Sequence, residues 1–354
     1  MTPAPDAVVT APDAVVTASG AAVSASDAAV TAPHAVVTGV GLALPGARHP
    51  ADLLRTTREP AEPVDPGTLI GRRGLRYKDR ATQLALCAAQ DVLRSSGLLP
   101  ADGEGGLTVP GDSVGVAVSS NLGNLDTVCE VASAIAAETT SRISPMALPN
   151  ASSNVIASSV AMRHGLRGPN LMFCNGPTSG LDAVYWAATL VAAGRCDRVV
   201  VIGVETANPV VEGLLGEVAE RLLDGAVALV VESGPAARAR GARPMAALGP
   251  YTRQGSVRAV VERVLPEGRP APGIWLTSQE KPPAPGTPGF PDAPRHDPTG
   301  AFGRGDGALG VLQCAAAVGR FGSYPTGTAL ITTGDDTDDA VAGLLLHSAR
   351  EERP

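Results

Sequence analysis

The chain has 354 residues, enough for one large domain or two small domains with a proper core. Apolar residues make up 44% of it and aromatic residues only 3%, so its core must be built from small, closely packed side chains. This composition favours a layered α/β protein. The net charge of −7 comes from mixed acidic and basic positions without a basic stripe, which argues against a nucleic-acid partner.

No uninterrupted apolar run reaches the roughly 18 to 20 residues that span a bilayer, so we expect no membrane segment. The five cysteines are odd in number, widely spaced and without a CxxC pair: Cys87, Cys129, Cys174, Cys196 and Cys314. Neither a disulfide framework nor a zinc site is indicated. We therefore expect no metal or other cofactor, and the reducing cytoplasm is the simplest compartment.

A seven-residue repeat runs through the first residues, as PDAVVTA, PDAVVTA, SGAAVSA, SDAAVTA and PHAVVTG. Its adjacent valines and its prolines do not fit a coiled coil. It also lacks the basic region and the long apolar region of a signal peptide. We predict that residues 1–33 form a low-complexity, disordered tail and that the fold begins with the last copy, at His34.

From there the chain alternates between predicted strands and helices. Strands are predicted at 35–38, 113–119, 171–174, 197–204 and 224–232, and helices at 80–96 and 178–193. Leu181, Val184, Ala188 and Val191 should face inward from the second helix. That helix and its flanking strands predict a right-handed βαβ unit. Residues 266–298 are so rich in proline and glycine that they should be mostly loop.

The stretch LMFCNGPTSGLDAV at 171–184 combines a strand, a Gly-Pro turn and a helix start, where enzymes often mount a nucleophile. Along the chain it follows the motifs HAVVTGVG, ISP and MRHGLRGPN and precedes GRCDRVVVIGVE and DGAVALVVE. This series resembles β-ketoacyl synthases of the thiolase superfamily, well over 34–249 and poorly beyond. The resemblance implies a thiolase-like layered αβαβα sandwich of two pseudo-equivalent halves. We place these halves at 34–235 and, shortened and divergent, at 236–354.

In active members of that family the turn presents a cysteine, whose thiolate accepts an acyl group. The resemblance places this position at Pro177, which has no nucleophile. Cys174 lies in the predicted strand and is interpreted as a buried structural thiol. Ser179 lies one helical step past the turn and is interpreted as a helix cap.

Active members also use two histidines to stabilise the charge that develops during decarboxylation. The region matching the first, WLTSQEKPPAPGTPG, contains no histidine, and Ala301 stands at the second position. His296 is nearby, and we interpret it as a solvated loop residue.

The motifs RHGLRGP and GLDA are most similar to the chain-length factor, the ketosynthase β subunit of type II polyketide synthases. This resemblance implies a non-catalytic subunit whose partners are a ketosynthase α subunit and an acyl carrier protein with its growing chain. The heterodimer would limit the length of a polyketide or polyene chain. Matching without gaps places the tunnel wall at Leu125, Val128 and Ala132, which share one helical face.

The dimer interface implied by the same resemblance is the strand before the turn, formed by Leu171, Met172, Phe173, Cys174 and Asn175. Three alternatives stay open. The helix at 125–132 could instead pack its apolar side on the core. The protein could be an acyltransferase or hydrolase that uses Cys174 or Ser179. It could also be a non-catalytic homodimer that binds acyl carrier protein.

Overall fold

The computed structural model describes residues 35–100, 105–140, 143, 145, 148–216, 221–266, 268–277 and 286–349. The repeat tail predicted at 1–33 and His34 lie outside these residues, as does the stretch 278–285. Within the described residues, none of the helices combines the length and the apolar character that crossing a bilayer requires.

The described strands form one hydrogen-bonded sheet of ten, in the order β3-β2-β4-β5-β1-β6-β10-β9-β7-β8. Those of the first half are β1 (Ala35–Ala43), β2 (Val114–Ser119), β3 (Asn170–Phe173), β4 (Arg198–Glu205) and β5 (Gly225–Ser233). Those of the second half are β6 (Ala246–Gln254), β7 (Ile274–Leu276), β8 (Arg295–His296), β9 (Thr328–Thr333) and β10 (Val341–Ser348).

The α-helices of the described residues connect these strands. They are α1 (Pro66–Ile70), α2 (Arg80–Ser95), α3 (Leu125–Glu138), α4 (Val155–His164), α5 (Ser179–Ala192), α6 (Pro209–Leu215), α7 (Gly234–Ala239), α8 (Val257–Val264), α9 (Thr299–Phe302) and α10 (Asp306–Ser323).

The two halves repeat one topology. Numbered from one to five within each half, the strands have the order 3-2-4-5-1 from the outer edge inward in both. Strand two is parallel to strands three and four, whereas strand five is antiparallel to strands four and one. The halves meet where β1 pairs with β6, at Val36↔Ala247 and Val37↔Ala246.

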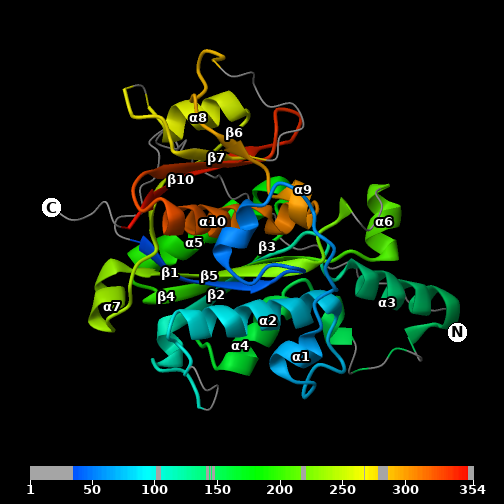
Figure 1. The fold of residues 1–354 in the computed structure, drawn as a ribbon. Coiled ribbons are helices and arrows are strands. Elements are labelled where there is room, and N and C mark those ends of the chain that lie inside the picture. Colours follow the sequence, from blue (N-terminus) through cyan, green and yellow to red (C-terminus); the bar gives the residue numbers. More distant parts are fainter. Residues whose placement is uncertain are drawn as a thin grey trace, which may run out of the picture.

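The layers follow from this duplication (Figure 1). Helix α8 covers the second-half strands, α5 and α10 lie between the two sets of strands, and α2 and α4 cover the first-half strands from below. The predicted αβαβα sandwich of two pseudo-equivalent halves is confirmed.

The predicted inward residues explain why α5 sits in the middle layer. Leu181, Val184, Ala188 and Val191 are all buried, in the core cluster that also contains the apolar side of α10. The βαβ prediction is also correct, because β3 and β4 both run parallel to β2 on its two sides. The first strand is longer than predicted: β1 continues to Ala43, since GVGLA pairs with β5 as an extended strand.

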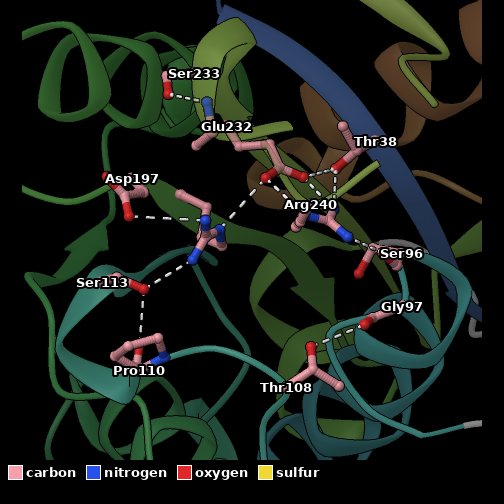
Figure 2. Close-up of polar contacts among 12 residues, drawn as sticks. Thr38, Ser96, Gly97, Thr108, Pro110, Ser113, Asp197, Glu232, Ser233 and Arg240 are labelled. Carbon is pink, nitrogen blue, oxygen red and sulfur yellow. Dashed lines mark hydrogen bonds and ion pairs between the residues drawn. The ribbon is translucent and has the colours of Figure 1, made fainter. Parts of the chain in front are cut away.

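A buried ion-pair network joins the inner strands of the first half at the end of the sheet opposite to the turn between β3 and α5 (Figure 2). Glu232, fully buried on β5, accepts hydrogen bonds from Thr38 on β1, from Arg240 just after α7 and, at 3.3 Å, from the Arg198 Nε of β4. The Arg198 Nη1 donates to the Ser113 Oγ at 2.7 Å. Burial would raise the pKa of Glu232, but the hydrogen bonds from Arg240 and Thr38 and the positive charges of Arg240 and Arg198 together hold the pKa below its usual value.

Candidate functional site

The turn between β3 and α5 is built as a nucleophile turn but carries no nucleophile at its centre. Gly176 has a φ of 66°, a left-handed conformation that favours glycine. It opens a short 3-10 turn, Gly176–Thr178, whose middle residue is Pro177. The Asn121 side chain, from the loop after β2, donates to the Gly176 carbonyl at 3.0 Å.

Ser179 is fully buried and its hydroxyl is hydrogen-bonded on several sides. The Ser179 Oγ accepts from the Asn175 amide at 2.6 Å and lies 2.9 Å from the Asn121 Oδ1 and 2.8 Å from the Gly176 carbonyl. The hydroxyl therefore fastens the turn to the neighbouring loop, rather than capping an amide of α5. A group held in this way cannot reach a ligand.

Cys174 is exposed, so its interpretation as a buried strand residue was wrong. Strand β3 ends at Phe173, and Cys174 follows it at the rim of a pocket. The pKa of its thiol is raised, first because the pocket walls remove water from it and second because the Glu205 carboxyl is near. A nucleophilic cysteine needs the opposite shift.

The pocket beside the turn has a volume of about 350 Å³. Cys174 and Gly176 contribute one side, and the start of α10, with Arg304 just before it and Asp306 as its first residue, contributes another. Its apolar wall is formed by the side chains Val211, Leu215, Leu222 and Leu223. The ends of β2, β3 and β4 in the first half and the start of α10 in the second half thus meet here, as expected at the carboxyl ends of parallel strands.

Glu205, the last residue of β4, lines this pocket and is buried. Its carboxylate accepts from the Asn121 amide at 2.6 Å, from the Leu122 amide at 3.1 Å and from the Ser120 hydroxyl at 3.4 Å. Burial raises the pKa of Glu205 to about 7, against the lowering effect of these hydrogen bonds. A Cβ at Gly307 would lie 2.6 Å from the Asn121 nitrogen, so only glycine fits there.

Glu205 was not predicted as a site residue, although it ends the motif GRCDRVVVIGVE. The sequence feature that could have indicated a site residue is a single glutamate at the end of a largely apolar strand. Such a group is buried only if hydrogen bonds satisfy it, and the loop after β2 supplies them.

The stretch that matches the first histidine, 275–289, contains no histidine and lies partly outside the described residues, and Ala301 stands at the second position. Ala301 is buried in α9 and lines a different pocket from that of Cys174. Thr277 follows β7 and is buried, and its hydroxyl has no hydrogen-bond partner among the described residues. His296 is not a solvated loop residue, contrary to our interpretation. It lies in β8, is 8% exposed, and its Nε2 is 2.9 Å from the Leu53 carbonyl oxygen.

The predicted tunnel residues lie on α3, a helix with little contact to the core. Leu125 is half-buried, Val128 is 38% exposed and Ala132 is exposed, while Ile135 one turn further is 44% exposed. Helix α3 contacts α6, where Leu214 is 62% exposed. The alternative that this face packs on the core of its own chain is wrong for Val128 and Ala132.

The predicted interface strand, β3, forms the outer edge of the first half. It pairs only with β2 among the described strands, and Leu171, Met172 and Phe173 are half-buried. Its other edge therefore presents unpaired backbone groups in the single chain. Within the described residues, no cluster of three or more histidine, cysteine or acidic side chains could hold a metal ion.

Comparison with known proteins bears on the first half in particular. Residues 61–217 match the family model of the β-ketoacyl synthase N-terminal domain. The 3-oxoacyl-[acyl-carrier-protein] synthase 2 of Vibrio harveyi is 27% identical over 210 residues, which are 52% of this chain and 49% of that protein. The granaticin polyketide putative β-ketoacyl synthase 1 of Streptomyces violaceoruber is 31% identical over 208 residues, 51% of this chain and 48% of that protein. The chain thus spans about half the length of these curated relatives.

Solved structures match over most of the chain. The ishigamide ketosynthase/chain length factor superposes with a TM-score of 0.67 at 23% identity, covering 89% of this chain and 99% of that one. A ketosynthase in complex with its type II polyketide synthase acyl-carrier protein gives a TM-score of 0.69 at 15% identity, covering 89% and 99%. The protein therefore has the thiolase-like fold of ketosynthases, and its residues 61–217 match the N-terminal domain of the β-ketoacyl synthase family.

Proposed function

We propose that the protein is a non-catalytic subunit of the chain-length-factor type in a type II polyketide synthase. It pairs with an active ketosynthase α subunit in the cytoplasm and forms one wall of a tunnel. The growing polyketide or polyene chain, delivered by an acyl carrier protein, extends into this tunnel, whose length limits the product. The subunit contributes binding and available space, and the partner contributes the chemistry.

The observation that carries this proposal is the turn without a reactive group. Pro177 stands at its centre, the Ser179 hydroxyl is fully buried, and the pKa of the Cys174 thiol is shifted away from the nucleophilic thiolate. Ala301 and the stretch 275–289 supply neither of the two histidines that the resemblance implies for the second half of the site. A fold that keeps its turn and lacks these groups supports a role in assembly and shape.

The surfaces of β3 and α3 support the pairing part of the proposal. Strand β3 is an edge strand with half-buried apolar side chains, and α3 is a helix whose apolar residues are exposed in the single chain. Both would be covered if a second chain of the same fold added its own edge strand. We expect a one-to-one complex whose interface includes residues 171–175.

The test is product length in a complex reconstituted with a ketosynthase partner. Ala132→Trp should shift the products toward shorter chains and leave the first condensations nearly unchanged, because overpacking a fitted apolar site costs about 1 to 3 kcal/mol. The matched control is Ala137→Trp, which lies five residues on, roughly 140° around the helix. Unchanged product lengths with Ala132→Trp, while the partner stays active, would contradict the tunnel placement.

The enzyme alternative has its own measurement. Cys174 is accessible, so a thiol-based acyltransferase predicts an acyl adduct on it after mixing with acyl carrier protein. We expect none on Cys174 or Ser179 by mass spectrometry of the intact protein and its peptides. A stable thioester or ester at either residue would replace the non-catalytic proposal.

A further inference from the structure

A pocket lies beside the turn although the turn carries no nucleophile. The tunnel role proposed for the α3 face does not require this pocket. At about 350 Å³ it lies within the size range of small-molecule sites. Four apolar side chains, from α6 and from the segment before β5, form one wall. Such a wall suits a hydrocarbon chain.

The polar side of this pocket is predominantly acidic. Glu205 lies in its wall and Asp306 at the start of α10, and Arg304 is the single cationic lining residue among the described ones. Burial raises the pKa of Asp306, Arg304 lowers it, and Asp338 and Asp335 on the β9–β10 connection raise it further. An anionic ligand that enters this pocket therefore meets two carboxyl groups, Glu205 and Asp306, and one guanidinium group, Arg304.

The two backbone amides that face the pocket from the loop after β2 are not free to bind an anion. The Asn121 and Leu122 amides after β2 point at the pocket end of β4, an arrangement that can bind a carboxylate or an oxyanion. Glu205 already occupies both amides, at 2.6 and 3.1 Å, and it also takes the Ser120 hydroxyl. The buried Glu205 carboxylate thus occupies the position at which these donors could bind an anionic ligand.

We propose that this pocket admits the uncharged end of an apolar chain and rejects carboxylate-bearing groups, and that Glu205 is the residue that determines this selectivity. Glu205 acts in two ways. When ionised, as at pH 8, it repels an incoming carboxylate, and its hydrogen bonds occupy the donors that the carboxylate would need. The same hydrogen bonds hold Asn121, whose side chain reaches the turn at Gly176 and Ser179.

Cys174 provides a reporter inside the protein because it is exposed and lines the pocket. Its modification by cationic and by anionic methanethiosulfonates of similar size is followed by peptide mass spectrometry at pH 8. The ratio of the two rates is then divided by the ratio for a free thiol in solution. This normalised ratio is independent of the thiolate fraction of Cys174, which is the same for both reagents.

We expect a normalised ratio of about tenfold or more in favour of the cationic reagent, as for a potential of a few kT. Glu205→Gln should lower it severalfold. Asp306→Asn, at the exposed start of α10, should also lower it and is a second variant if Glu205→Gln folds poorly. Asp112→Asn, before β2 at the opposite end of the sheet, is the matched control and should leave the ratio unchanged. A wild-type ratio equal to that of the free thiol overturns the proposal, as does one that neither pocket variant changes.

Protection of Cys174 tests the ligand class directly. Octanol should slow modification by a neutral methanethiosulfonate, and octanoate at the same concentration should not. Leu215→Trp, which fills the apolar wall, should abolish protection, whereas Leu214→Trp, on the neighbouring residue outside the pocket lining, should preserve it. Equal protection by octanoate, or none by octanol, overturns the proposal. Neither experiment measures product length, so a failure here is distinguishable from a failure of the proposed function.

Discussion

The two halves of the molecule share one strand order but differ in their outer strands. The inner strands β1, β5, β6 and β10 have eight or nine residues in both halves. The outer strands β2 and β3 have six and four residues, whereas β7 and β8 have three and two. The connection between β2 and β3 carries α3 and α4, while β7 and β8 are joined by the short stretch 277–294.

This difference lies where the resemblance to β-ketoacyl synthases implies two histidines. The family's histidines are expected around the ends of the two outer strands of the second half, the strands that are shortest here. The inner strands are buried between layers, and a change there would affect the whole core. The second half therefore has long inner strands in the core and short outer strands at its edge.

The largest effect on stability is expected at Glu232, a buried charged residue of the first half whose counterpart in the second half is His347. By strand pairing, Arg198↔Glu232↔Val36 in the first half corresponds to Thr328↔His347↔Ala247 in the second. Glu232→Gln should cost about 3 to 5 kcal/mol in the free energy of unfolding, because two arginines lose their buried partner charge. His347→Gln, at a half-buried position, should cost clearly less. Denaturant unfolding measures both, and equal costs would contradict the assigned importance of the network.

Glu205 lines the pocket to which both halves contribute, and its raised pKa predicts that the stability of the protein depends on pH. Its pKa is raised to about 7 in the folded chain, so unfolding releases a proton between the ordinary glutamate pKa and 7. The free energy of unfolding should therefore fall as the pH rises through this window, by at most about 3 kcal/mol. Glu205→Gln should remove this contribution. Parallel stability curves for wild type and variant between pH 5 and 8 would be inconsistent with the raised pKa.

A smaller effect is expected where the central helices of the two halves cross. A Cβ at Gly310 on α10 would lie 2.5 Å from the Leu181 nitrogen of α5, and one at Gly180 would lie 2.7 Å from the Gly310 nitrogen. Gly310→Ala should destabilise the protein by about 1 to 3 kcal/mol through overpacking. Gly322→Ala, near the end of the same helix with open space around it, should be neutral or slightly stabilising. Thermal unfolding of the two variants separates crowding from helix propensity.

The smallest effects concern one buried threonine in each half. Thr277→Val should be neutral or stabilise the protein by up to about 1 kcal/mol, because the Thr277 hydroxyl has no partner among the described residues. Thr38→Val should destabilise it by about 1 to 3 kcal/mol, because the Thr38 hydroxyl donates to Glu232. Destabilisation of both to the same extent would show that the Thr277 hydroxyl is satisfied after all.

The sequence by itself determined the helices and strands that have a strong local pattern. The inward face of α5 and the βαβ unit around it were predicted correctly, because apolar spacing along the chain reports which face is buried. The ordered motifs predicted the sandwich of two halves. The absence of a side-chain nucleophile at Pro177 also needed only the sequence, since it depends on residue type alone.

Only the tertiary structure decided which side chains reach a pocket. Cys174 and His296 were both assigned the wrong exposure, because burial depends on segments distant in sequence: β3 ends one residue early, and His296 reaches the Leu53 carbonyl 243 residues away. Glu205 remained unassigned because its hydrogen-bond donors come from the loop after β2, 84 residues earlier at Asn121. Local sequence periodicity reports only the face of an element, whereas a site is made by loops that the fold brings together.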